Sequence, residues 1–195
     1  MRAMETRWNK TPCGISEGEG AASTRIRAAC PKDAEILALL GRLTFSETFG
    51  YLFRDHPDDL RAYLDTTFGV EKIRRSLGKT ENAYWLASIR SLPVGYAKLK
   101  HPSAVAAMPH PDAAQLQKIY VLQDFLGRGI GRGLLHAVLD HAAAARVPAL
   151  WLAVLRENSH AIRFYAEHGF TALGEDTYAI GAQIFDFHLM ARRAG

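Results

Sequence analysis

The sequence contains few cysteines and no metal-binding pattern. Cys13 and Cys30 are the only two cysteines in 195 residues, and neither belongs to a C-x-x-C motif or a Cys/His cluster. They are too few for a disulfide framework. The eight histidines form no group with metal-ligand spacing, so we expect no metal. Because the sequence also lacks an 18-residue apolar run and the apolar core of a secretory signal, we expect a cytoplasmic protein with no membrane association.

The charge is weakly positive and evenly distributed. The chain has 24 Lys and Arg residues against 20 Asp and Glu residues, a formal net charge of +4. Since no long basic block occurs, this balance suits an anionic partner such as cofactor phosphates and does not indicate nucleic acid. A chain of this length with 48% hydrophobic residues is expected to form one domain. Residues 1–22 are polar and aperiodic, which predicts a disordered N-terminal extension or leader before a domain over residues 23–195.

Periodicity and turn residues predict alternating strands and helices. The expected strands are 24–29, 83–89, 92–100, 116–122 and 149–155, with further strands within 177–192. The expected helices are 33–45, 56–68, 69–78, 131–145 and 159–170. This order predicts a mixed α/β sheet covered by helices.

Four glycines alternate in the segment QDFLGRGIGRGLLHAVL, residues 123–139, at the start of a predicted helix. They are Gly127, Gly129, Gly131 and Gly133. Amides at a helix N-terminus bind anions, and glycine lets a phosphate approach the backbone where a Cβ would block it. The motifs G-x-G-x-x-G and G-x-x-x-x-G-K-[ST] are both absent, which disfavours a Rossmann dinucleotide site and a P-loop. A turn that is merely tight would need fewer glycines.

Two segments carry a resemblance to one family. The glycine segment resembles the acyl-CoA-binding motif Q/R-x-x-G-x-G/A of the GCN5-related N-acetyltransferases (GNAT), with Leu126 where the family commonly has Gln or Arg. NSHAIRFYAEHGF resembles the family's N-x-x-A-x-x-x-Y-x-x-x-G-F segment through Asn158, Ala161, Tyr165, Gly169 and Phe170. The resemblance covers about residues 24–192. It implies a single GNAT-like α/β domain with a mixed, mostly antiparallel central sheet flanked by helices.

The resemblance implies acetyl-CoA as the co-substrate and assigns residues to it. The pantetheine arm would pair with the backbone of Ile119, Tyr120 and Val121, as an added strand would. The side chains of Ile119 and Val121 are expected in the core. The pyrophosphate would lie over Gly127, Arg128, Gly129, Ile130, Gly131 and Arg132. Asn158 would hydrogen-bond the cofactor or an ordered water.

The resemblance also implies that Tyr165 is the general acid that protonates the departing thiolate. A phenol with an ordinary pKa of about 10 carries its proton at pH 7 and can supply it. The alternative is a core aromatic on an amphipathic helix. Gln117 stands where many relatives carry a Glu that acts as the base. The base therefore stays open between a water chain and the side chains of Glu157, Glu47, His101 and His110.

The segment between the first two predicted strands, residues 44–77, mixes aromatic and acidic side chains. These are Phe45, Phe49, Tyr51 and Phe53 with Glu47, Asp55, Asp58, Asp59 and Asp65. The mix suits a polycation and resembles the polyamine-acetylating bacterial subgroup, but core aromatics with a solvated acidic face explain it equally well. We expect transfer of an acetyl group to a primary amine, with a small amine or polyamine favoured and a protein amine also open. A non-catalytic acyl-CoA-binding or sensing module is the alternative, and homodimer formation stays open.

Overall fold

The computed structural model describes residues 24–108 and 110–193, so the predicted N-terminal extension over residues 1–22 lies outside the described part. Within that part the strands are β1 (Thr24–Ala28), β2 (Asn82–Ile89), β3 (Leu92–Lys100), β4 (Ala114–Val121), β5 (Ala149–Leu155), β6 (Thr171–Ile180) and β7 (Gln183–Arg193). The α-helices are α1 (Ala34–Phe49), α2 (Pro57–Thr67), α3 (Val70–Gly78), α4 (Ile130–Ala144) and α5 (Ser159–Glu167). Short 3-10 turns are η1 (Pro31–Asp33), η2 (Gly50–Phe53) and η3 (Gln123–Phe125).

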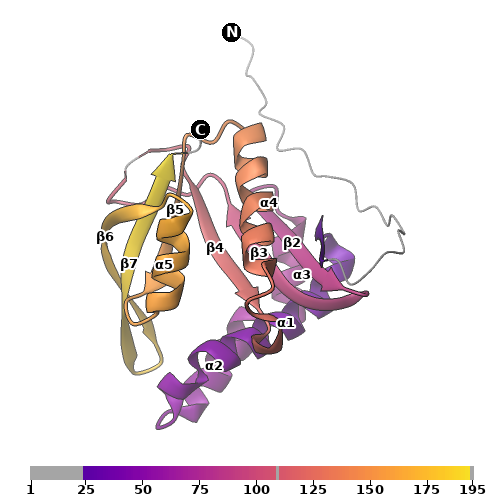
Figure 1. Ribbon diagram of the computed structural model, residues 1–195. Coiled ribbons are helices and arrows are strands. Elements are labelled where there is room, and N and C mark those ends of the chain that lie inside the picture. The colour runs from indigo at the N-terminus through magenta and orange to yellow at the C-terminus, as the bar shows by residue number, and fades with distance from the viewer. Residues whose placement is uncertain (1–23, 109, 194–195) are drawn as a thin grey trace.

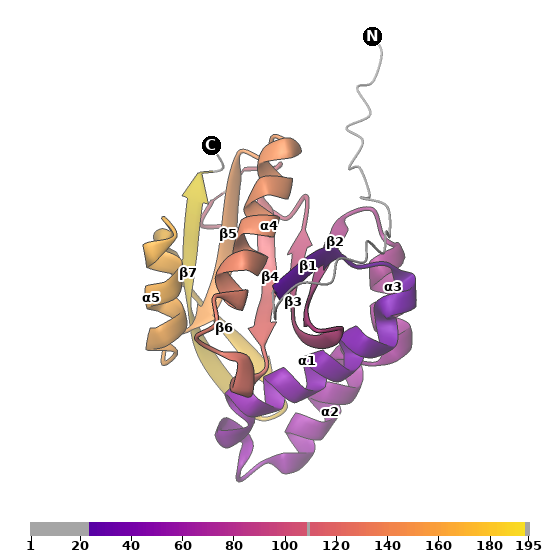
Figure 2. The same ribbon diagram turned by 45° about the vertical axis from the view of Figure 1, so that its right-hand side comes forward.

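The strands form one seven-stranded sheet in the order β1-β2-β3-β4-β5-β7-β6. Every neighbouring pair is antiparallel except β4 and β5, which are parallel. The helices flank this sheet (Figures 1 and 2). The expected fold, a single α/β domain with a mixed, mostly antiparallel central sheet, is therefore confirmed.

The sheet forks between β4 and β5. These strands pair only at Ala114 with Leu150 and at Gln115 with Trp151. On its other side β4 stays paired with β3 as far as Val121. The backbone of β4 beyond Gln115 therefore has an edge without a strand partner in the described part of the chain, although β4 lies in the middle of the sheet.

Each face of the sheet carries its own apolar layer. On one face, Leu134 and Leu135 of α4 pack with Leu150 of β5 and with Tyr165 at the end of α5. On the other face, α1 and α3 pack on β2 and β3 through a separate cluster that includes Leu37, Ile73, Leu86 and Tyr96. A third cluster around Phe45, Phe53 and Phe68 joins α1, η2 and α2 to the β6–β7 hairpin.

Two element boundaries differ from the expectation. Helix α1 continues to Phe49 instead of ending at Phe45, and the rings of these two residues pack 4.9 Å apart. Strand β6 begins at Thr171 and not near Thr177. Because β6 is an edge strand whose side chains are mostly exposed and whose pairing shifts between Ala172 and Gly174, its first half carries no apolar alternation. Across the described ranges no helix is both long and apolar enough to cross a membrane.

Candidate active site

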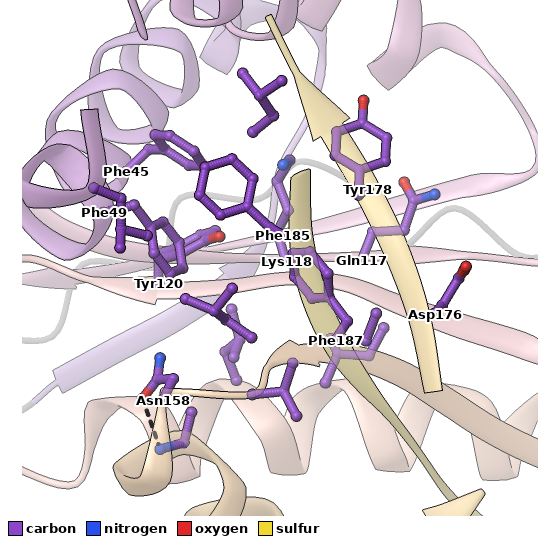
Figure 3. A pocket seen from close by; sticks show the side chains of 18 of the residues that line it. Phe45, Phe49, Gln117, Lys118, Tyr120, Asn158, Asp176, Tyr178, Phe185 and Phe187 are labelled. Carbon is purple, nitrogen blue, oxygen red and sulfur yellow. Dashed lines mark hydrogen bonds between the residues drawn. The ribbon is translucent and has the colours of Figure 1, made fainter. Parts of the chain in front are cut away.

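A pocket of about 310 Å³ lies at the fork between β4 and β5. Tyr165, Asn158 and Ala161 line it from α5 and its N-terminus, and β4 lines it from Gln115 to Tyr120. In Figure 3, Asn158 lies at one end, and Gln117, Asp176 and Tyr178 lie at the other. The fork thus collects side chains from β4, from the segment of Asn158, Ala161 and Tyr165, and from the β6–β7 hairpin in one cavity.

The glycine turn leads into the N-terminus of α4. Gly127 and Gly129 have φ angles of +74° and +77°, a conformation that L side chains rarely adopt. The first backbone hydrogen bond of α4 runs from Gly133 N to Gly129 O at 3.0 Å, and Gly129 supplies no side-chain cap. The amides of residues 130–132 therefore have no partner within the helix. A Cβ at Gly127 would meet no atom within 4 Å, so the turn is open to a ligand and fits a phosphate group.

The side chains of this turn do not all face the open space. Ile130 is 2% exposed and belongs to the core under α4, so only its amide is available to a ligand. Arg128 donates from Nη2 to the carbonyl of Asp124 at 3.1 Å and stacks over Phe125 at 5.0 Å. Leu126, where the family motif has Gln or Arg, is 57% exposed. Backbone amides are therefore the main donors that the turn offers, with Arg132 exposed beside them.

The side chains of β4 pack on the two faces of the sheet, whereas its backbone borders the fork. Ile119 and Val121 pack against the core under α4, as expected. Tyr120 points to the other face, where its ring lies 6.3 Å from that of Phe49 and 5.8 Å from that of Tyr96. The groups that these residues offer along the fork are the amides and carbonyls of the unpaired edge.

Asn158 is the N-cap of α5. Its Oδ1 accepts a hydrogen bond from the amide of Ala161 at 3.0 Å (Figure 3). One end of the side-chain amide is thus used by the fold, which the sequence motif did not reveal. Asn158 also lines the pocket, so its Nδ2 group is available to donate a hydrogen bond to a ligand.

Tyr165 is both a core residue and a pocket residue. It is 8% exposed and its ring lies 5.2 Å from Phe164 and 5.7 Å from Phe170, so it packs in the core. It also lines the fork pocket. Burial raises the pKa of its hydroxyl above the usual value of 10. The phenol therefore keeps its proton throughout the physiological range, as a general acid must.

The candidate bases named from the sequence do not line the fork pocket. Glu47 Oε2 accepts from the amide of Gln123 at 3.0 Å, and His101 and His110 hydrogen-bond to Asp112 near the start of β4. Glu157 is exposed outside it, whereas Gln117 does line the pocket and donates to Gln115 Oε1 at 2.9 Å. Residues 24–108 and 110–193 contain no group of three or more His, Cys, Asp or Glu positioned to hold a metal.

Four of the five acidic side chains named in residues 44–77 have partners outside the pocket. Asp59 Oδ2 accepts from the amide of Ala182 at 3.1 Å, and Asp65 pairs with Arg42 at 2.7 Å. Asp58 pairs with Arg61 at 3.4 Å on the surface of α2. Phe45, Phe49 and Phe53 line the pocket, whereas Tyr51 and the acids of the segment do not.

Asp176 on β6 is a pocket residue that sequence reasoning missed. It is the sole carboxylate among the described residues that line the fork pocket, and its Oδ1 accepts from the amide of Thr177 at 2.8 Å. No motif marks it, and its strand shows no apolar alternation. Only the return of the β6–β7 hairpin to the fork brings it there.

Comparisons with known proteins agree with this fold. The family model described as "Acetyltransferase (GNAT) family" matches residues 44–170, more than half of the chain. An uncharacterized N-acetyltransferase in the pepI 3′ region of Lactobacillus delbrueckii subsp. lactis is 26% identical over 151 residues, 77% of this chain and 86% of that protein. An uncharacterized N-acetyltransferase of Mycobacterium tuberculosis (strain ATCC 25618 / H37Rv) is 29% identical over 136 residues, 70% of this chain and 83% of that protein.

A solved structure shows the same architecture. The PaiA N-acetyltransferase from Thermoplasma acidophilum, in complex with coenzyme A, superposes with a TM-score of 0.70 at 19% identity, covering 88% of this chain and 99% of that one. The family model and the relatives together indicate an acyl-CoA-dependent N-acetyltransferase. The chain belongs to the GNAT family of acetyltransferases.

Proposed function

We propose that the protein transfers an acetyl group from acetyl-CoA to a primary amine by direct attack, with the fork pocket as the active site. The observation that carries the proposal is that two features border the fork and a third follows the strand that forms it. The unpaired edge of β4 and the buried phenol of Tyr165 border the fork pocket, and the open amide turn follows β4 along the chain at the N-terminus of α4. Each suits a different part of acetyl-CoA.

The cofactor would be bound mainly by backbone groups. The edge of β4 around Ile119, Tyr120 and Val121 suits the amide-rich pantetheine arm, which can pair with it as a strand does. The amides of residues 127–132 and the N-terminal end of the α4 dipole suit the pyrophosphate. Asn158, which lines the fork pocket, would add its Nδ2 group as a further donor.

Tyr165 and Asp176 would act on the leaving group and on the substrate ammonium, respectively. When bound, acetyl-CoA supplies a thioester whose carbonyl carbon the amine attacks, so that a C–N bond forms and the C–S bond breaks. Tyr165 holds its proton until the sulfur departs and then donates it to the thiolate. Asp176 attracts the substrate ammonium into the pocket. The ammonium then loses its proton to water, because the side chain of Gln117 cannot accept a proton.

Thiol release tests the proposal directly. Acetyl-CoA would be incubated with the full chain and a panel of amines, and free CoA thiol would be measured against a no-amine control. We expect amine-dependent thiol release that requires Tyr165. Tight binding of acetyl-CoA without thiol release by any amine would instead favour the non-catalytic binding or sensing module.

A further inference from the structure

A second pocket, of about 300 Å³, lies on the α3 side of the sheet and adjoins the fork pocket. The two pockets share the lining residues Tyr63, Gln115, Gln117, Lys118 and Tyr178. Beyond these, α3 lines the second pocket with Lys72 and Ser76, and β3 lines it with Lys98. A small molecule that extends out of the fork would therefore enter this second pocket.

Two lysines of neighbouring strands face each other in this second pocket. Lys98 of β3 and Lys118 of β4 are direct cross-strand partners, and both are half-buried. Lys72 of α3 adds a third ammonium group at the exposed rim. Like charges placed directly opposite each other in an antiparallel pair destabilise it. The arrangement is therefore costly unless something compensates the charge.

No acidic residue provides that compensation within the described part of the chain. Asp and Glu are absent from the residues that line the second pocket, and neither Lys98 nor Lys118 forms an ion pair there. Their ammonium groups lie over aromatic rings instead: Lys98 Nζ is 5.4 Å from the centre of Tyr84, and Lys118 Nζ is 4.9 Å from that of Phe68. Buried charges in proteins are normally paired, so this pair is suited to an anion from outside the chain.

The surroundings make both ammonium groups sensitive to such an anion. Burial, together with the charges of Lys100, Lys72 and Lys79, lowers the pKa of Lys98 to about 8, while Glu81 opposes this shift. Burial, together with Lys98 and Lys72, lowers the pKa of Lys118 to about 8. At pH 7 both groups are still mostly protonated, and an anion bound between them would favour the protonated form.

We propose that this second pocket binds the carboxylate or phosphate group of the acceptor, so that the acceptor is a small amine that also carries an anionic group. The proposal rests on the acetyl transfer proposed above. The amino group would face Asp176 in the fork pocket, and the anionic group would lie between Lys98 and Lys118. A free polyamine would meet three ammonium groups here, and no acid of residues 44–77 lines either pocket to hold it.

The first test compares matched amines in the thiol-release assay. The panel pairs α- and ω-amino acids and glycyl peptides with their carboxamides, pairs aminoalkyl phosphates with the corresponding amino alcohols, and includes spermidine. We expect kcat/KM to be at least about 10-fold higher for the anionic member of the best pair, since a hydrogen bond to a charged group contributes that much. The carboxylate and phosphate arms then distinguish the two sources of the anion.

Variants assign that preference to the two lysines. Lys98→Met and Lys118→Met keep most of the side-chain stem and should each reduce the ratio of kcat/KM between the anionic amine and its neutral partner by about 10- to 100-fold. Lys32→Met, an exposed lysine in η1 away from both pockets, is the matched control and should leave the ratio unchanged. A ratio that survives both pocket variants, or a turnover of spermidine and carboxamides equal to that of the anionic amines, would overturn the proposal.

A labelling experiment separates this inference from acetyl transfer itself. Without acetyl-CoA, the lysines would be modified with an N-hydroxysuccinimide acetate and mapped by mass spectrometry, with Lys32 as the internal reference. Anionic amines should protect Lys98 and Lys118, whereas their carboxamides should not. If no amine releases thiol but protection occurs, acetyl transfer fails and the anion site stands. If thiol is released but no anionic amine protects either lysine, the anion site fails and acetyl transfer stands.

Discussion

Lys98 on β3 and Lys118 on β4 occupy opposite positions of one antiparallel ladder, with no carboxylate among the side chains that line the pocket between them and α3. Neighbouring pairs in the same ladder join Tyr96 to Tyr120 and Ala97 to Ile119, which pack well without charge. Two opposed lysines are therefore a local exception. Their repulsion lowers the stability of the unliganded protein, and a bound anion would relieve it. Local departures of this kind from stable packing are expected at binding sites.

Lys118→Met should raise the free energy of unfolding at pH 7. The native pKa of about 8 lies below that of an unfolded lysine, about 10.4, so the buried ammonium destabilises the native state at pH 7. Between these values the unfolded chain binds more protons, and wild-type stability should gain from this group as the pH rises. The advantage of the variant should therefore shrink from pH 8 to 10. Urea unfolding of the wild type and the variant at pH 7, 8 and 10, with Lys32→Met as the control, measures this difference in stability. A Lys118→Met protein that is less stable than the wild type at pH 7 would contradict the assignment.

Tyr165→Phe should lower kcat by about 10- to 1,000-fold with little change in stability or acetyl-CoA affinity, because it removes a proton and keeps the ring that packs on Phe170. Because burial raises the pKa of Tyr165 above 10, the wild-type rate should show no loss from its ionisation between pH 7 and 10. Steady-state kinetics across this range, with a thermal melt of the variant, test both points. Wild-type turnover by Tyr165→Phe under conditions where chemistry limits would assign the residue to packing alone.

Gly131→Val should weaken acetyl-CoA binding by about 10-fold or more. The side chain has room within the fold, since the nearest atom to a Cβ there is Phe164 Cζ at 4.0 Å, but its branches would crowd the amides of the turn. Gly78→Val, at the end of α3 and with no atom within 4 Å of its Cβ, is the matched control. Calorimetric titration with acetyl-CoA measures the difference. Equal affinity of the two folded variants would argue against a pyrophosphate cradle at this turn.

Two substitutions of Asn158 should separate its structural role from its role toward a ligand. Asn158→Asp keeps an oxygen that can cap α5 but removes the Nδ2 donor, so stability should persist while acetyl-CoA affinity or kcat falls. Asn158→Ala removes both and should also cost about 1 kcal/mol of stability. Thermal melts and kinetics on the pair provide the measurement. If Asn158→Asp matches the wild type in both assays, the residue serves only as a cap.

The parts of the fold that local signals specify were predicted from the sequence. Gly129 at a left-handed position before α4 and Asn158 at the cap of α5 act on their own neighbours, so the helices that they introduce were expected almost as observed. The family motifs lie in the same two segments. The match therefore located the turn, the phenol of Tyr165 and the central strands together.

The substrate side of the site depends on contacts between distant segments, which a single sequence does not reveal. Lys98 meets Lys118 only because β3 and β4 pair in one register, with a shift next to Lys98, across the long segment that separates them. The carboxylates of Glu47 and Asp59 accept hydrogen bonds from backbone amides more than seventy residues away in the sequence. The acidic residues that lie near the aromatic ones in the sequence are therefore not gathered at the pocket in the structure. Pairing of an edge strand likewise decides where Asp176 lies.

The short ladder between β4 and β5 makes the width of the fork sensitive to packing at its junction. From Gln115 to Val121, β4 runs for about 20 Å beyond the last pair that joins it to β5. A rotation of about 3° at that junction would change the separation at the far end by about 1 Å, the difference between a good and a poor hydrogen bond. Ala114 and Leu150 are fully buried at this junction, so their packing sets the angle between β4 and β5. Small changes in their packing should therefore alter the width of the fork at its far end.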